Sequence, residues 1–228
     1  MPSSGGAWLD FPLTRGFLDL VEKVEIPRKT IYRLSIYQRC LSKLLENEIE
    51  KVSSSALAKA AGVKPAQLRR DLTYFGQFGT RGLGYDVQDL REAIRDVLGR
   101  TQLQPVILAG AGNLGSALLR YQGFGKEGFE VIAAFDAVPE AVMQRGIEIP
   151  VYDVDEMLAF IRKHEVRLAI LTVPGEHAQE VANELVEAGV TGILNFSPTV
   201  LQVPESVTVN NVDLAVELES LSYFVGRE

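Results

Sequence analysis

Residues 110–115 read Gly-Ala-Gly-Asn-Leu-Gly, the pattern G-x-G-x-x-G, directly after the apolar run Val106–Ala109. A continuous apolar run is typical of a buried parallel strand, and helical periodicity follows over residues 114–121. The glycine pattern alone is weak evidence, but between a strand and a helix it indicates a dinucleotide-binding loop. This stretch therefore predicts a Rossmann domain.

The three glycines have separate expected roles. Gly110 permits the tight turn, Gly112 lets the backbone approach a pyrophosphate, and Gly115 lets the helix pack closely on the strand. The N-terminus of that helix would face the phosphates. The candidate pyrophosphate site is the whole loop: Gly110, Ala111, Gly112, Asn113, Leu114 and Gly115.

A carboxylate, Asp136, ends the next predicted strand (129–135), 21 residues after Gly115. A carboxylate at this place accepts hydrogen bonds from a ribose and repels a 2′-phosphate. The sequence therefore favours NAD(H) over NADP(H) as the ligand.

Strands and helices alternate through the second half, which predicts an α/β fold with a doubly wound parallel sheet. The chain then closes with a short strand and an amphipathic helix. We place the Rossmann NAD(H)-binding domain at residues 105–211 and a C-terminal helix within 212–228. The further expected strands are 149–151, 168–173, 192–196 and 207–210, and the helices lie near Glu140 and at 155–164, 176–188 and 212–225.

The first half predicts a winged helix-turn-helix domain at residues 27–99. Apolar periodicity, serine caps and glycine stops place helices at 27–46, 56–61, 66–75 and 87–98. The glycine-rich segment 76–85 predicts a hairpin, which after a recognition helix is a wing. Residues 1–26 form an extension that carries no motif.

Charge is distributed unevenly along the chain. The total is −7, yet residues 27–86 hold eleven basic and five acidic side chains, a net charge of +6 that leaves −13 elsewhere. A basic N-terminal region joined to an acidic C-terminal region is typical of a two-domain DNA-binding protein.

The predicted helix 66–75 has two faces. Leu68, Leu72 and Phe75 form a core stripe, and Asp71 faces inward beside them as the expected partner of an arginine. Arginine can contact guanine and glutamine can contact adenine in the major groove, while Arg81 could reach a minor groove or the DNA backbone. An ordinary solvated basic helix is the alternative. The candidate DNA-binding residues are Lys64, Gln67, Arg69, Arg70, Thr73, Tyr74 and Arg81.

Composition argues against several classes of protein. One cysteine, Cys40, and two histidines, His164 and His177, make a disulfide or a zinc site improbable, so no metal is expected. No apolar run approaches the roughly 20 residues that span a bilayer. Residues 1–10 lack the pattern of a secretory signal, so the expected location is the cytoplasm, with no membrane partner.

Several runs of the sequence are distinctive when they are taken together. They are Gln67–Gly76, Gly79–Tyr85, Gly110–Gly115, Tyr121–Gly125, Thr172–Pro174, Gly192–Phe196 and Asn211–Asp213. These runs resemble the Rex family of redox-sensing transcriptional repressors. The likeness covers about residues 27–224, and the motifs occur in the family's order.

The resemblance implies a homodimeric repressor, not an enzyme, that binds palindromic operator DNA when free or NAD⁺-bound and is released by NADH. It implies that the last helix is domain-swapped, and that Leu214 stands where many members have a phenylalanine near the nicotinamide. Further cofactor-binding residues that it implies are Thr172, Val173, Pro174 and Asn195. An inter-subunit switch is implied at Arg39, Tyr121 and Asp213.

Three alternatives remain open at this point. An NAD-dependent oxidoreductase would use His177 near the nicotinamide as its proton donor or acceptor, although little chain is left for a substrate domain. A DNA-binding protein could instead sense an acyl-CoA or another nucleotide. A pure interaction module would leave the glycine loop unused.

Overall fold

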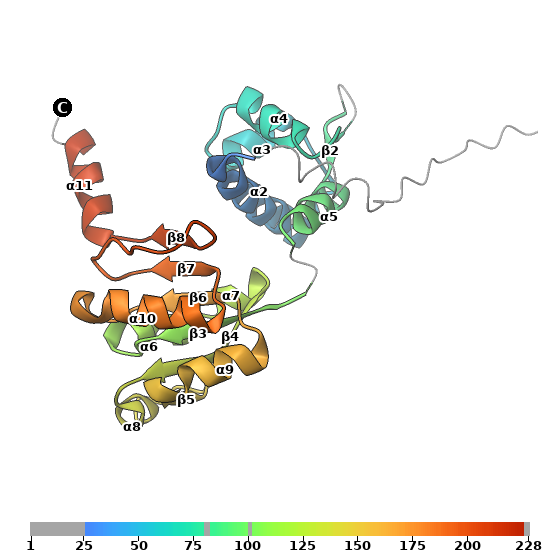
Figure 1. Ribbon diagram of the computed structural model, residues 1–228. Coiled ribbons are helices and arrows are strands. Elements are labelled where there is room, and N and C mark those ends of the chain that lie inside the picture. Colours follow the sequence, from blue (N-terminus) through green and yellow to red (C-terminus); the bar gives the residue numbers. More distant parts are fainter. Residues whose placement is uncertain (1–25, 80–82, 100–101, 226–228) are drawn as a thin grey trace, which may run out of the picture. The chain divides into compact units, whose positions relative to one another are not determined.

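The computed structural model describes residues 26–79, 83–99 and 102–225 (Figure 1). The chain divides into two compact units, one ending at Thr101 and the other beginning at Gln102. The predicted N-terminal extension and Arg81 lie outside the described residues, apart from Ile26. None of the helices in the described ranges is long and apolar enough to cross a membrane.

The first unit is a small helical domain with one apolar core. Leu34, Tyr37 and Leu41 line the buried face of its longest helix and contact the core side chains of the other three helices. The Ser53 hydroxyl accepts a hydrogen bond from the Ala56 amide at 3.1 Å and so caps the second helix. The helices are α2 (Arg28–Glu46), α3 (Ser54–Ala60), α4 (Pro65–Thr73) and α5 (Val87–Val97).

The turn between α3 and α4 contains Gly62 at φ +68°, a backbone conformation that favours glycine. Pro65 opens α4, where the absence of an amide hydrogen costs nothing. These two residues produce the predicted helix-turn-helix.

The predicted hairpin in segment 76–85 includes residues 80–82, which lie outside the described residues. Strand β2 (Tyr85–Asp86) pairs antiparallel with β1 (Lys51–Val52), a strand before α3 that the sequence did not predict. Gly84 explains the close approach, because a Cβ at this position would lie 2.4 Å from the Val52 carbonyl oxygen. Because β1 and β2 lie more than thirty residues apart in the sequence, the residues of segment 76–85 do not by themselves predict this pairing.

The second unit contains a six-stranded sheet in the order β5-β4-β3-β6-β7-β8, and every neighbouring pair is parallel. Counted from β3, this order is 3-2-1-4-5-6, the order of the Rossmann fold, and it reverses between β3 and β6. The doubly wound prediction is confirmed. The strands are β3 (Gln104–Ala109), β4 (Phe129–Asp136), β5 (Val151–Asp153), β6 (Leu168–Leu171), β7 (Gly192–Asn195) and β8 (Thr208–Asn211).

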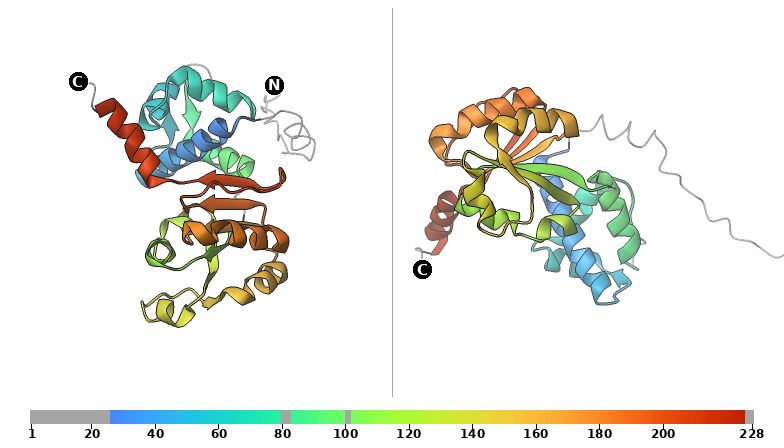
Figure 2. Two further views of the ribbon diagram at one scale, coloured as in Figure 1. Left: turned by 60° about the vertical axis from the view of Figure 1, so that its left-hand side comes forward. Right: turned by 90° about the horizontal axis from the view of Figure 1, so that it is seen from below.

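Helices cover both faces of the sheet, and each face has its own apolar core (Figure 2). The core with α9 and α10 contains the aromatic side chains Phe135, Tyr152 and Phe160. The opposite core contains Leu119 and Val142. The helices are α6 (Asn113–Leu119), α7 (Gly123–Lys126), α8 (Pro139–Met143), α9 (Met157–His164) and α10 (Gly175–Ala188).

Two details differ from the prediction. Strand β5 begins at Val151 rather than at Ile149, because Pro150 has no amide hydrogen; its carbonyl instead accepts the Ala134 amide at 2.9 Å. The short helix α7 is an element that periodicity did not predict, since four residues carry too little pattern.

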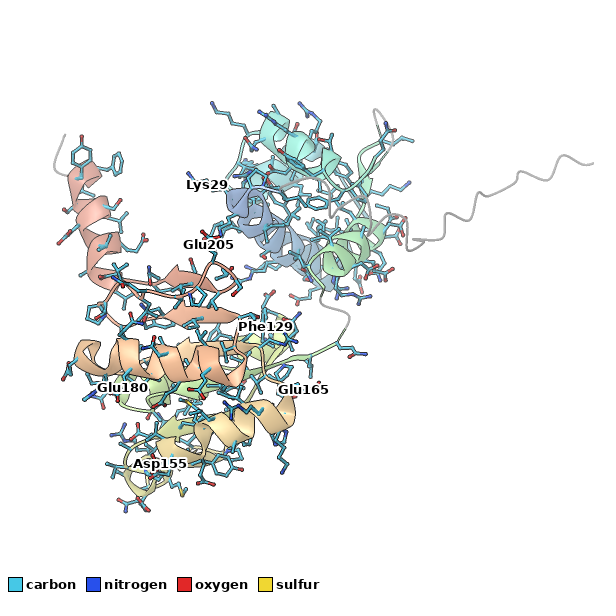
Figure 3. All side chains as sticks on the ribbon, in the orientation of Figure 1. Lys29, Phe129, Asp155, Glu165, Glu180 and Glu205 are labelled. Atoms are coloured by element: carbon cyan, nitrogen blue, oxygen red, sulfur yellow. The ribbon has the colours of Figure 1, made fainter. Side chains whose placement is uncertain are left out.

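Helix α11 (Leu214–Val225) has no buried residue. The Asp213 carboxylate precedes it and accepts the Ala215 amide at 2.9 Å, which caps the helix. Leu218 is 66% exposed and Phe224 is 72% exposed, and Figure 3 shows side chains projecting from the helix on several sides. A single chain therefore leaves an apolar helix uncovered.

Candidate functional site

At two positions of the loop after β3 only glycine fits, because a Cβ atom would collide with neighbouring backbone. Gly110 has φ +91°, and a Cβ there would lie 2.8 Å from the Val173 backbone nitrogen. A Cβ on Gly115 would lie 2.1 Å from the Gly110 carbonyl oxygen. The fold therefore explains these two glycines without any ligand.

Gly112 is different. A Cβ at this position would meet no atom within 4 Å, and the backbone has φ −61°, which any residue adopts. Gly112 precedes the first turn of α6, where no side chain caps the helix. Nothing inside the chain requires glycine here, so the open backbone fits the pyrophosphate of a dinucleotide.

Asp136 lies beside this loop at the end of β4. Its Oδ2 accepts the Ala111 amide at 2.7 Å, and its Oδ1 accepts the Val138 amide at 3.0 Å. Both oxygens keep further acceptor capacity, since a carboxylate can accept about four hydrogen bonds. The carboxylate thus has the position expected of a ribose-binding group, and it also holds the loop, which the sequence did not indicate.

One arginine that sequence reasoning missed contacts the same loop, and a second arginine contacts the first. Arg145 Nη1 donates to the Ser116 hydroxyl at 3.1 Å and to the Ala111 carbonyl at 3.5 Å. Arg120 Nη2 donates to the Arg145 carbonyl. Both side chains are exposed. Arg145 comes from the α8–β5 connection, and no motif in the sequence marks it.

The segment after β6 forms the other side of the loop. Thr172 Oγ1 donates to the Ala109 carbonyl at 3.2 Å, and Val173 lies against Gly110. Pro174 is exposed directly before α10. Two of the four residues implied by the resemblance, Thr172 and Val173, thus contact the glycine loop.

Asn195 is the fourth, and it is fully buried. Its amide nitrogen donates to the Thr199 carbonyl at 2.8 Å and to Asn211 Oδ1 at 2.9 Å, and its Oδ1 accepts the Ser197 amide at 2.9 Å. These bonds hold the ends of β7 and β8 together, so the side chain is not presented to a ligand in this conformation.

His177 is exposed in the first turn of α10, where its backbone amide bonds to the Pro174 carbonyl at 3.0 Å. No carboxylate that the structure describes forms an ion pair with it. This environment contains nothing that would orient an imidazole for proton transfer.

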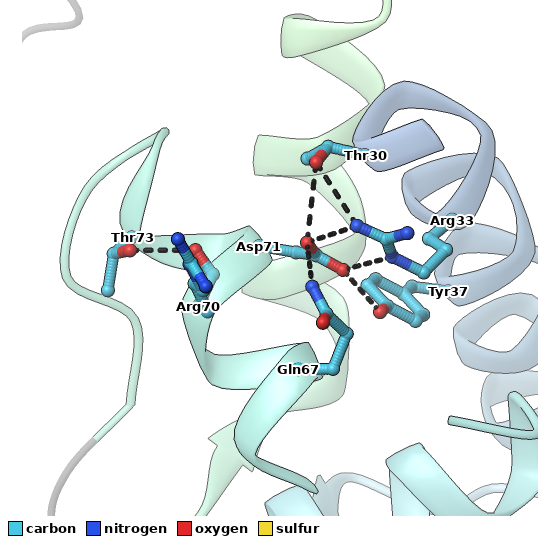
Figure 4. A network of polar contacts seen from close by, with 7 residues as sticks. All are labelled: Thr30, Arg33, Tyr37, Gln67, Arg70, Asp71 and Thr73. Carbon is cyan, nitrogen blue, oxygen red and sulfur yellow. Dashed lines mark hydrogen bonds and ion pairs between the residues drawn. The ribbon is translucent and has the colours of Figure 1, made fainter. Parts of the chain in front are cut away.

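The first unit contains a buried polar network between α2 and α4 (Figure 4). Asp71 is 1% exposed, and its carboxylate accepts two hydrogen bonds from Arg33, both at 2.6 Å. Tyr37 Oη donates to it at 2.7 Å and Gln67 Nε2 at 2.9 Å. The prediction that Asp71 pairs with an arginine is confirmed.

Ionisation states in this network follow from its geometry. Burial raises the pKa of Asp71, but hydrogen bonds from Arg33, Tyr37 and Gln67 outweigh burial and hold the pKa below its ordinary value. Burial, followed by the hydrogen bond to Asp71, raises the pKa of Tyr37. Asp71 is therefore charged and Tyr37 neutral near pH 7.

The outer face of α4 carries the candidate DNA-binding residues. Lys64, Arg70 and Thr73 are exposed, and Arg70 makes no side-chain hydrogen bond or ion pair with the described residues. Arg69 is exposed too, but donates to the Ser54 hydroxyl at 3.0 Å.

Two further candidates are less available for contact with a base. Gln67 is half-buried with its amide nitrogen bound to Asp71. Tyr74 is half-buried and packs against the core.

The implied switch residues lie in different units. Arg39 is exposed on α2 of the first unit. Tyr121 follows α6 in the second unit, is 57% exposed, and contacts Phe124 edge to face with ring centroids 5.0 Å apart. Asp213 caps α11.

Comparison with known proteins agrees with this division. The family model of a putative DNA-binding protein N-terminus matches residues 25–73, and that of a CoA binding domain matches residues 101–199. The chain is 45% identical to the redox-sensing transcriptional repressor Rex of Pelotomaculum thermopropionicum, over 89% of this chain and 95% of that one. It is 47% identical to Rex of Streptomyces coelicolor, over 89% and 79% respectively.

Solved structures agree as well. The crystal structure of RSP in complex with β-NAD⁺ and operator DNA matches with a TM-score of 0.82 at 37% identity, covering 89% of this chain and 94% of that one. RSP in complex with β-NADH matches with a TM-score of 0.78 at 35% identity, covering 89% and 95%.

A helix-turn-helix unit joined to a Rossmann unit with an open glycine loop defines a transcriptional regulator with a nucleotide-binding domain. Its relatives are named as repressors, not as enzymes, so the oxidoreductase alternative based on His177 is set aside. The chain belongs to the Rex family of redox-sensing transcriptional repressors.

Proposed function

We propose that this chain is a repressor that senses the NADH/NAD⁺ ratio: it binds operator DNA when free or NAD⁺-bound and is released by NADH. The observation that carries the proposal is the open backbone at Gly112 beside the Asp136 carboxylate, in a chain whose other unit exposes Arg70 on a recognition helix. The solved complexes of RSP, a relative, with β-NAD⁺ and operator DNA and with β-NADH support both halves of the proposal.

In this proposal the dinucleotide lies at the carboxyl ends of the strands, where the strand order reverses. The amides at the start of α6 bind the pyrophosphate, and Asp136 binds the adenosine ribose. The dinucleotide would supply a nicotinamide ring. The protein senses whether this ring is oxidised or reduced and does not change its redox state. The proposed binding residues are Gly110, Ala111, Gly112, Asn113, Leu114, Gly115, Asp136, Thr172, Val173 and Pro174, with Asn195 supporting them from within the fold.

Discrimination between the two redox states has a physical basis. NAD⁺ carries a positive charge on its nicotinamide ring, whereas the ring of NADH is neutral. A closed apolar pocket removes water from the ring and therefore favours the neutral form. The ligand shifts the protein between two shapes only by its difference in affinity for them.

We infer that DNA is bound by a homodimer. Two recognition helices of a dimer meet successive major grooves about 34–36 Å apart on a palindromic site, and a shape change that alters this spacing releases the DNA. The proposed contacts are Lys64, Gln67, Arg69, Arg70, Thr73, Tyr74 and Arg81, of which Arg70 is the best placed for a base.

The proposed dimer is formed by exchange of α11 between subunits. The exposed apolar side chains of this helix support the exchange, because a second subunit would cover them. Arg39, Tyr121 and Asp213 would couple the two subunits. We place the repressor in the cytoplasm, where its operator and the nicotinamide pool are found together.

The test is DNA binding by the purified chain. Selection from genomic or random duplexes supplies an operator, and NADH and NAD⁺ are then titrated against the complex. Release by micromolar NADH, opposed by NAD⁺, is the expected result. Tight DNA binding that neither nucleotide changes would contradict the redox switch and retain the repressor. No DNA binding at all would contradict both.

A further inference from the structure

The first two residues of the glycine loop have polar backbone groups that the chain itself binds. The Gly110 amide donates to the Phe135 carbonyl at 2.8 Å, and the Gly110 carbonyl accepts the Thr172 hydroxyl. The Ala111 amide donates to Asp136 Oδ2 at 2.7 Å. Three of the four backbone groups of these two residues are thus bound by β4 or by the segment after β6.

The fourth group, the Ala111 carbonyl, is bound by a serine. Ser116 lies on α6 and is 2% exposed, and its hydroxyl donates to this carbonyl at 2.7 Å. Arg145 Nη1 donates to the serine oxygen at 3.1 Å, which leaves the hydroxyl proton for Ala111. Arg120 Nη2 donates in turn to the Arg145 carbonyl. Hydrogen bonds connected in this way strengthen one another.

The second part of the loop presents free donors. The amides of Gly112, Asn113 and Leu114 donate to none of the described residues, as expected at the first turn of a helix. The Ala111 carbonyl and the Gly112 amide belong to one peptide group, which is trans and planar. The hydrogen bond from Ser116 to that carbonyl therefore also fixes the direction of the Gly112 amide. Donors whose directions are fixed before the ligand arrives bind it at a lower entropic cost.

We propose that Ser116 is a positioning residue of the dinucleotide site: its hydroxyl holds the Ala111 carbonyl and thereby directs the Gly112 amide toward the pyrophosphate. Arg145 acts through Ser116, because its guanidinium orients the hydroxyl and needs no contact with the ligand. The inference rests on the proposed dinucleotide site. It predicts that NADH and NAD⁺ are affected alike, since both nucleotides contain the same pyrophosphate.

The test is titration of NADH and NAD⁺ against the purified full chain and its variants, well below the melting temperature of each, so that loss of folded protein does not weaken binding. Ser116→Ala is expected to weaken both nucleotides about three- to tenfold, the effect of one neutral hydrogen bond. Arg145→Gln is expected to weaken both about twofold, because this side chain is exposed. Ser35→Ala is the matched control, because the Ser35 hydroxyl also donates to a backbone carbonyl, that of Ile31, but lies in the first unit.

The possible results are distinct. Equal weakening of NADH and NAD⁺ by Ser116→Ala, with Ser35→Ala unchanged, supports the inference. Unchanged affinity for both nucleotides overturns it and leaves the proposed function intact, and weakening of NADH alone overturns it too, because the effect would then arise at the nicotinamide. If Ser116→Ala does not fold, Arg145→Gln decides by the same criteria. Failure of the folded wild-type chain to bind either nucleotide contradicts the proposed function and the inference together.

Discussion

The Asp71 carboxylate accepts two hydrogen bonds from the Arg33 guanidinium, from Nε and Nη2, each at 2.6 Å. The pair joins α4 to α2 across 38 residues of sequence, and only the arginine side chain, at 20% exposure, reaches solvent. Such bidentate pairs define orientation as well as contributing energy. The recognition helix is therefore held at a set angle on its scaffold.

Replacement of Asp71 by Asn is expected to lower the free energy of unfolding by about 2–3 kcal/mol, because the partly buried Arg33 loses its charged partner. The exposed pair Arg95–Asp96, with 4.0 Å between Nε and Oδ1, supplies the control. Asp96→Asn should change the stability by less than about 0.5 kcal/mol. Urea titration at pH 7 measures both, and equal values would contradict the role of Asp71.

The same network predicts a dependence of stability on pH. The pKa of Asp71 is lower in the folded chain than in the unfolded one, so the unfolded state binds more protons, and stability rises with pH in this range. The contribution is present above the ordinary aspartate pKa of about 3.9 and disappears as the pH falls through the folded pKa. Asp71→Asn should therefore flatten the acid limb of a stability–pH curve.

Two alanine substitutions in the glycine loop should affect different properties, one the stability of the fold and the other nucleotide binding. Gly115→Ala places a methyl group 2.1 Å from the Gly110 carbonyl oxygen and is expected to lower stability by about 1–3 kcal/mol. Gly112→Ala meets no atom within 4 Å and should leave the melting temperature unchanged while weakening NADH binding. Calorimetry and nucleotide titration separate the two. A Gly112→Ala variant with wild-type affinity would contradict the placement of the pyrophosphate.

Asp136→Ala should weaken NADH binding about tenfold, because the ribose hydroxyls lose a charged acceptor. The Ala111 amide also loses its acceptor, so part of the effect comes from the loop. Asp136→Asn separates these contributions, since its remaining oxygen can still accept from Ala111. Unchanged NADH affinity in both variants would show that the Asp136 carboxylate does not contribute to nucleotide binding.

Arg70→Ala should weaken operator binding by about 1–3 kcal/mol and leave NADH affinity unchanged, because the side chain is exposed and lies in the other unit. Gel shifts with the selected operator and with a scrambled duplex measure both affinity and specificity. An unaltered gel shift would indicate that other residues of α4 contact the bases. Lys43→Ala, at the last turn of α2, provides a control for loss of positive charge.

Leu218→Glu together with Leu221→Glu should convert the proposed dimer into monomers, because both apolar side chains are more than 60% exposed in a single chain. Sedimentation at several protein concentrations measures the change. Glu217→Gln on the same helix should leave the assembly intact. A wild-type chain that is monomeric at micromolar concentration would contradict the exchange of α11.

Most of the fold could be predicted from local patterns. The apolar runs of β3 and β6, the glycine loop and the helical periodicity of α2 and α10 all lie within short windows of sequence. Features that depend on residues far apart in the chain could not be assigned. Asp71 was expected to bind an arginine, but nothing local identifies Arg33, and the pairing of β2 with β1 is set by contacts across the first unit.

The candidate site divides in the same way. The glycines and Asp136 follow a spacing that the chemistry of dinucleotides imposes. Arg145 lies in a connection without periodicity, and only the folded chain brings it to Ser116 and Ala111. Gln67 shows the converse: its residue type suggests an adenine contact, yet the fold uses its amide to hold Asp71.

The space around Gly112 has an evolutionary consequence. Gly110 and Gly115 are constrained by the fold, so a lineage that loses either one loses stability as well. Gly112 is constrained only by its proposed ligand. A single codon change there would leave a folded repressor that no longer responds to nucleotide, so selection on this residue acts on regulation alone.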